Sequence, residues 1–276
     1  MRIGNKIKKR LSKVNSFLRS RKKPGTDDIH DLRLEIKHLE AFLQLMSAQK
    51  DFSANPEFPP HLESLFHTAG KIRKFELEKE AIRAITNKNG IYAPEHILEK
   101  LKVSKRKSVK NLRKKRRNYE AFKPGDFARH PDSNLSKLTW QQFIGVQAGS
   151  ILNVLEGDIL SDVRSLHQLR KTLKSVLYVL PTGKNAAAPV HSFLDGNKKL
   201  LKSVEAKIGS IHDVDFFIRW MDKKQDIEQG PGQETLKKIM EVWKNDIERM
   251  KEDLRPSLPV IRQFALDLNH HLLLYR

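Results

Sequence analysis

Histidine, arginine and lysine recur at one helical spacing in two distant parts of the chain. The segment IHDLRLEIKHLEAFL (29–43) aligns without gaps to LHQLRKTLKSVLYVL (166–180), and each contains the pattern His-x-x-Arg-x-x-x-Lys. At about 100° per residue, the three basic side chains of each pattern share one helix face. Arginine offers a planar fork to phosphate oxygens, lysine a compact charge, and histidine a donor that titrates near neutral pH. These residue types predict a site for dense phosphate.

Each pattern forms a basic stripe without an acidic residue. The two stripes consist of His30, Arg33 and Lys37, and of His167, Arg170, Lys171 and Lys174. A solvated helix face usually interleaves acids with bases, because oppositely charged neighbours one turn apart stabilise the helix. Like charges crowded on one face destabilise it, so the stripes favour an anion-binding role over a merely solvated surface.

The elements that must position these stripes are amphipathic helices. Apolar residues lie opposite each stripe and are expected in the core: Ile29, Leu32, Ile36, Leu39 and Leu43 in the first segment, and Leu166, Leu169, Leu173, Val176 and Leu180 in the second. An earlier apolar stripe (Ile3, Ile7, Leu11, Val14, Leu18) predicts a first helix. Thr26 or Asp27 is the expected N-cap of the helix that follows.

Helical periodicity continues along the chain and predicts an all-α protein. Further helices are expected at 57–86, 93–120, 135–156, 161–180, 188–224, 232–253 and 257–275. The segment FKPGDFARHPDSN (122–134) is rich in Pro, Gly and Asp, which is typical of a linker.

A second matching pair of segments supports an internal repeat. AGKIRKFEL (69–77) aligns to IGSIHDVDF (208–216) at an offset of 139, close to the offset of 137 between the two stripes. Two offsets that agree this closely predict a tandem duplication. The expected organisation is one unit over 1–276, with repeats at 1–122 and 135–276 joined by a linker at 123–134.

The charge balance limits the class of partner. The 276 residues include 53 Lys and Arg against 33 Asp and Glu, a formal net charge of +20. Such a field attracts nucleic acid, anionic membrane or a phosphate polymer. The sequence has no cysteine, which excludes disulfides and thiolate chemistry within it. Without a signal-peptide pattern or a long apolar run, a cytoplasmic protein without a membrane partner is expected.

The two stripes, each followed by a Gly-x-Ile segment, resemble the CHAD family, named for a histidine-containing α-helical domain. The resemblance implies two pseudo-symmetric four-helix bundles whose basic faces meet around a central pore or cleft. It also implies binding of inorganic polyphosphate without catalysis or cofactor, in association with polyphosphate granules. Lys71 and Arg73 join the expected site by this resemblance. The chain departs from the family's Arg-Asp pair, with Arg73-Lys74 in one copy and His212-Asp213 in the other.

The segment KVSKRKSVKNLRKKRR (102–117) holds 10 Lys or Arg in 16 residues. Two interpretations are equally consistent with this composition. The segment is either a solvated helix end or a rim that gathers polyanion toward the stripes. In the second interpretation Lys105, Arg106, Lys110 and Arg113 belong to the polyphosphate site. A nucleic-acid-binding patch would have the same composition.

Two alternatives come from other classes of protein. General nucleic-acid binding would use the same electrostatics, but aromatic residues are only 7% of the chain and the stripes lack a stacking platform. A metal-dependent phosphohydrolase would use His-Asp pairs such as His30-Asp31. The repeat opposes this, because the counterpart of Asp31 is Gln168. The resemblance to the CHAD family makes polyphosphate the expected partner, with weaker nucleic-acid binding also allowed.

Overall fold

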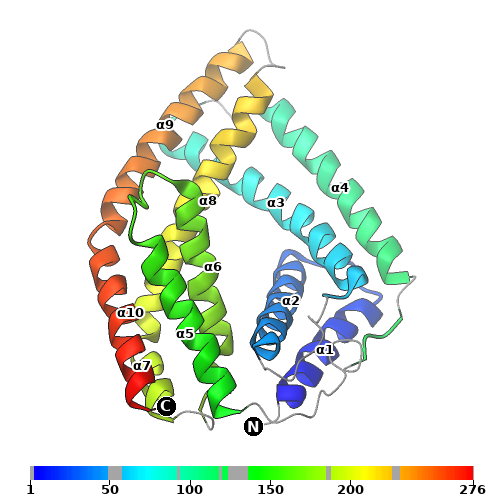
Figure 1. Ribbon diagram of the computed structural model, residues 1–276. Helices are drawn as coiled ribbons and strands as arrows, with labels where there is room; N and C mark the ends of the chain where they lie inside the picture. The colour runs from blue at the N-terminus through cyan, green and yellow to red at the C-terminus, as the bar shows by residue number, and fades with distance from the viewer. Residues whose placement is uncertain are drawn as a thin grey trace.

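The computed structural model describes residues 3–48, 58–91, 94–117, 120–123, 136–184, 188–225 and 231–275 (Figure 1). Within these ranges the secondary structure is helical and contains no strand, which confirms the all-α prediction. The helices are α1 (Ile3–Arg19), α2 (Thr26–Ser47), α3 (Pro60–Asn89), α4 (Glu95–Arg117), α5 (Lys137–Val154), α6 (Val163–Val179), α7 (Ala188–Gly196), α8 (Lys198–Gln225), α9 (Pro231–Leu254) and α10 (Ser257–Leu274). The expected linker lies outside the described residues from 124 onward.

The apolar stripes read from the sequence are the inward faces of α1, α2 and α6. All fifteen of their expected core residues are buried. Burial of these faces is the main stabilisation of amphipathic helices, whose intrinsic propensity alone is marginal. Trp140 and Trp243 are buried, whereas Trp220 is only half-buried.

Two local expectations were wrong. The helix expected at 188–224 is broken, because α7 ends at Gly196 and α8 begins at Lys198. Asn197 lies between them, and its side-chain amide donates to the carbonyl of Phe193 at 2.9 Å. The N-cap of α2 is Gly25, not Thr26 or Asp27. Its backbone N–H donates to Asp28 Oδ2 at 2.8 Å, which ties down the entry to the helix. Thr26 instead donates its hydroxyl to Glu76 on α3.

Consecutive long helices pack against one another in both halves of the chain. α2 lies against α1 and α3, and α3 against α4; α6 lies against α5 and α8, and α8 against α9. α10 covers α5 and α7. The halves meet where α2 contacts α6 and α5, and again where α3 contacts α9, as Figure 1 shows with α2 beside α6 and with α3, α4, α8 and α9 converging above them.

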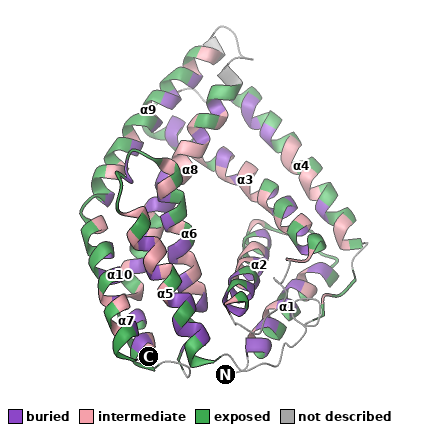
Figure 2. Cartoon of the chain, viewed as in Figure 1, coloured by how far each residue is buried: buried purple, intermediate pink, exposed green. Residues whose placement is uncertain are grey.

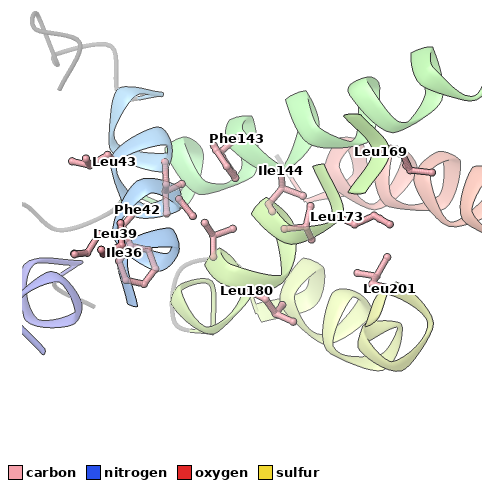
Figure 3. Close-up of a cluster of buried hydrophobic side chains, with 14 of the residues drawn as sticks. Ile36, Leu39, Phe42, Leu43, Phe143, Ile144, Leu169, Leu173, Leu180 and Leu201 are labelled. Carbon is pink, nitrogen blue, oxygen red and sulfur yellow. The ribbon is translucent and has the colours of Figure 1, made fainter. Parts of the chain in front are cut away.

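Two hydrophobic clusters hold this arrangement together. The larger one joins α1, α2, α5, α6, α7 and α10 with parts of α3, α4, α8 and α9. Figure 3 shows part of it, with Phe42 from α2, Phe143 from α5 and Leu173 from α6. The smaller one is built by α3, α4, α8 and α9 around residues such as Ile82 and Trp243. Buried residues accordingly run along the inner faces of the helices in Figure 2, while the outer faces are exposed.

Candidate polyanion-binding site

Arg33 and Lys37 on α2 lie over an aromatic ring from α3. The guanidinium carbon of Arg33 is 4.3 Å from the ring centroid of Phe66, and Arg33 Nη1 donates to the carbonyl of Phe66 at 3.1 Å. Lys37 Nζ is 5.8 Å from the same centroid. The ring attracts both cations but carries no net charge, so their charge remains available to an anion.

The equivalent bases on α6 meet a carboxylate instead. Arg170 Nε donates to Glu205 Oε1 on α8 at 2.9 Å, and Lys174 Nζ is 3.1 Å from the same oxygen. Glu205 follows Phe66 by 139 positions, the offset already seen between the Gly-x-Ile segments. One position thus contacts the arginine and lysine in each half, with a ring in one and an acid in the other.

A glycine lies under each arginine. A Cβ built on Gly209 would stand 2.8 Å from Arg170 Nη2 and 3.1 Å from its Cζ. A Cβ on Gly70 would collide with Arg33 Nη1 in the same way. The two Gly-x-Ile segments therefore have a physical role, because only glycine lets the guanidinium group lie this close to the following helix.

The two basic faces influence each other across the α2–α6 contact. Burial is the main cause that lowers the pKa of Lys37 to about 8, followed by repulsion from Lys174, Arg33 and Arg170 in that order. A lysine with its pKa this far below its usual range lies among cations that the protein neutralises only in part. Bases from both stripes therefore lie close enough to act on one ligand.

His167 extends this group of bases on α6. Its ring stacks on that of His212 from α8, with centroids 4.8 Å apart and planes 27° from parallel. Burial lowers the pKa of His167, helped by the positive charge of His212, Lys171, Arg170 and Lys37. His167 is therefore mostly neutral at pH 7 and gains a proton more readily when an anion is bound.

Arg73 links these residues to the third helix of the first half. Burial lowers the pKa of Arg33, and the nearby charge of Arg73 lowers it further. Arg73 Nη1 also lies 3.7 Å from Glu76 Oε2, while Lys105 on α4 lies 2.7 Å from Glu76 Oε1. We call the following residues the central basic cluster: Arg33, Lys37, Arg73, His167, Arg170, Lys171 and Lys174.

The remaining expected bases are placed elsewhere. Lys105, Arg106, Lys110 and Arg113 line a groove of about 1340 Å³ between α4, α3 and the start of α2. His30 is exposed near the start of α2, one turn before Arg33. Lys71 lies on a different side of α3, where it lines a small pocket with Lys115. The structure therefore separates the expected site into a central cluster, the α4 groove and two outlying residues.

Sequence reasoning did not identify Phe66, Glu205 or His212 as part of this site. Each of these three residues lies on a neighbouring helix and contacts a stripe residue from there. The periodicity of the stripe itself therefore does not indicate them. The signal was present in the 139-residue offset, which pairs Phe66 with Glu205 and Arg73 with His212. Extending the alignment outward from the two glycines would have found them.

Metal chemistry has no preformed ligand set in the described part of the chain. Among those residues, no group of three or more His, Asp or Glu side chains is placed to hold a metal ion. His30 and Asp31, which suggested a phosphohydrolase, are both exposed on α2. Within the same ranges, no helix combines the length and the apolar character needed to cross a membrane.

Comparisons with known proteins add no relative. No protein-family model matches the chain, and a search of curated proteins finds no match.

Proposed function

We propose that the chain binds inorganic polyphosphate, without cleaving it, at the central basic cluster. The observation that carries this proposal is the environment of Lys37, whose pKa of about 8 reflects burial beside Lys174, Arg33 and Arg170. Crowded, partly desolvated cations are unfavourable unless an anion joins them. A phosphate polymer presents closely spaced charges that would interact with several of these bases together.

The choice of polyphosphate over other polyanions depends on the likeness to the CHAD family. The residues themselves support a dense anion, because the central basic cluster offers three arginines for bidentate contacts and three lysines for point charges. The proposal includes a tandem duplication that brings two equivalent basic faces around one ligand. Its support is the repeated Arg-over-Gly contact and the similar packing order of α1–α4 and of α5, α6, α8 and α9.

A competition assay tests the choice of ligand. Labelled long-chain polyphosphate is titrated with the protein, then displaced with single-stranded RNA or duplex DNA at equal phosphate concentration and fixed salt. Polyphosphate is expected to bind more tightly than either nucleic acid. Equal or tighter binding of RNA or DNA would favour a general nucleic-acid-binding protein.

Paired substitutions locate the site. Arg33→Gln with Arg170→Gln is expected to weaken polyphosphate binding by about tenfold or more, because each arginine can form charge-assisted hydrogen bonds. Lys237→Gln with Lys244→Gln is the matched control, since it removes two charges from exposed positions on α9. An equal loss in both variants would mean that total charge, not the cluster, determines binding.

Recovery of the polymer tests the absence of catalysis. Polyphosphate incubated with the protein and Mg2+ or Mn2+ is expected to keep its chain length on a gel. Shortened chains would favour the phosphohydrolase alternative.

A further inference from the structure

Helix α4 carries far more positive charge than its place in the fold requires. Its sequence, residues 95–117, contains 11 Lys or Arg and 2 acids. Helix α9 has a comparable place, because each packs along the long helix before it and contributes to the smaller hydrophobic cluster. Yet α9, residues 231–254, contains 5 Lys or Arg and 6 acids. Packing therefore does not explain the charge of α4.

The bases of α4 form a line along the groove. Lys102, Arg106, Lys110, Arg113 and Arg117 recur at intervals of three and four residues and all line it. At 1.5 Å per residue, this line is about 22 Å long. Lys23, which precedes α2, also lines the groove. A line of this length fits an extended polyanion better than a single phosphate group.

The groove has little negative charge of its own. Glu76 is the single acid among the described residues that line it. That carboxylate is already engaged, because it accepts a hydrogen bond from Thr26 at 2.8 Å and lies 2.7 Å from Lys105. Lys102 is also paired, at 2.8 Å from Glu99, which does not line the groove. The other four bases of the line repel one another, because the described lining of the groove contains no further acid to offset them.

The lining also indicates the chemistry of the occupant. Of the described residues around the groove, none is aromatic, and its apolar atoms come from aliphatic residues such as Ile29, Ile72 and Val109. Nucleic-acid grooves that bind single strands usually stack bases on aromatic rings. The groove thus favours a polymer of phosphate without bases.

The groove connects to the central basic cluster through Arg73. This residue lies between Arg33, whose pKa it lowers, and Glu76, which borders the groove beside Lys105. We infer that the α4 groove binds a second stretch of the same polyphosphate chain that the central basic cluster holds. The inference depends on the proposed function and adds to it a preference for long chains, because two linked contacts raise the affinity of a polymer that reaches both.

The test compares two ligand lengths with one triple variant. Arg106→Gln, Lys110→Gln and Arg113→Gln remove three exposed bases and keep good helix formers. The probes are tripolyphosphate and polyphosphate of about 100 phosphates, long enough to reach both contacts. Binding of the long chain is expected to fall about tenfold or more, and binding of tripolyphosphate less than about twofold. The slope of log affinity against log salt for the long chain should fall by about 2, at roughly 0.7 for each base removed, as for single strands.

The control is a variant with the same charge change elsewhere, Lys237→Gln, Lys244→Gln and Arg262→Gln on α9 and α10. It is expected to bind both probes like the wild type. An α4 triple variant that also binds like the wild type, or that loses affinity equally for both lengths, would overturn the inference and leave the proposed function standing. Loss of RNA binding without loss of polyphosphate binding would reassign the groove to nucleic acid. A wild-type protein that binds neither probe would overturn the proposed function itself.

Discussion

Arg170 lies so close to Gly209 that a methyl group on this glycine would come within 2.8 Å of the guanidinium Nη2. Gly70 gives Arg33 the same close approach in the first half of the chain. Both glycines are inside long helices, where glycine is about 1 kcal/mol less favourable than alanine. Gly70 and Gly209 therefore each weaken the helix that contains them and make room for an arginine side chain.

Gly209→Ala is expected to separate stability from binding. The added methyl group displaces the flexible end of Arg170, while the helix gains up to about 1 kcal/mol in propensity. Thermal unfolding should show stability equal to or above that of the wild type, and polyphosphate titration should show roughly fivefold weaker binding, about 1 kcal/mol.

Gly149→Ala is the matched control for this substitution. Gly149 lies inside α5, and a Cβ there would have open space around it. This variant should gain similar stability and bind normally. Unchanged binding by Gly209→Ala would show that the position of Arg170 is unimportant for the ligand.

Glu205 is expected to compete with polyphosphate for Arg170 and Lys174, because its carboxylate contacts both bases. Glu205→Gln removes the negative charge that the two bases now share, so polyphosphate should bind about three- to tenfold more tightly, the equivalent of a surface ion pair. Stability should fall by about 1 kcal/mol or less, because these side chains are partly exposed.

Glu252→Gln is the control, since Glu252 pairs with Arg255 at 2.8 Å on an exposed part of α9. It should leave binding unchanged. Weaker binding by Glu205→Gln would mean that Glu205 positions the bases for the ligand and does not compete with it.

The fold was predictable to the extent that helices are local. Ile36 and Leu39 recur at helical spacing on α2, as do Leu169 and Leu173 on α6, and the faces they define are buried. The break between α7 and α8 was missed because it falls on one residue, Asn197, whose side-chain amide donates to the carbonyl of Phe193, and apolar periodicity does not register such a bond. Gly25 was missed as a cap because its contribution is a backbone N–H, with no side chain to reveal it.

The candidate site was less predictable, because its chemistry arises between helices. A helical wheel places Arg33 and Lys37 on one face but does not show that the face meets Phe66. The acid-free character of the second stripe holds only along α6, since Glu205 reaches it from α8. Lys71, which follows Gly70 in the sequence, was expected in the same site as the stripes. Its side chain lies on a different side of α3 from the contact between Gly70 and Arg33.

Lys37 should make the stability of the unliganded protein depend on pH. Its pKa is lowered from 10.5 to about 8, so the unfolded chain holds this proton more tightly than the folded one. The resulting destabilisation is fully present below pH 8 and disappears as the pH rises from about 8 to 10.5. Lys37→Gln should therefore be more stable than the wild type at pH 7, by on the order of 1 kcal/mol after solvent screening, and the difference should shrink by pH 10. Urea unfolding at the two pH values measures it; a constant difference would contradict the assignment.

The same residue should make binding weaken at high pH. A bound polyanion favours the charged lysine, so affinity should fall by about tenfold or less between pH 7 and 9.5 as Lys37 loses its proton in the unliganded protein. Lys37→Arg should lose most of this dependence, because arginine stays charged throughout. Equal pH profiles for wild type and Lys37→Arg would assign the dependence to another group.

His167 should strengthen binding at low pH. The charged or titratable groups that act on it are His212 from α8, Lys37 from α2, and Arg170 and Lys171 on its own helix. Burial and these positive neighbours lower its pKa below 6.5, so it is mainly neutral at pH 7 in the unliganded protein. Polyphosphate adds negative charge and favours the protonated ring, so binding takes up a proton and tightens as the pH falls from 7 to 5.5.

The measurement is the ratio of wild-type to His167→Gln affinity across this range, in which the titration of the ligand itself cancels. The ratio should rise about three- to tenfold toward pH 5.5, as expected when one neighbouring charge is gained. His191→Gln is the control, because burial also lowers the pKa of His191 but this residue lies on α7. Its pH profile should match the wild type. A flat ratio for His167→Gln would place this imidazole outside the ligand's field, and the second half of the site would then consist of Arg170, Lys171 and Lys174 alone.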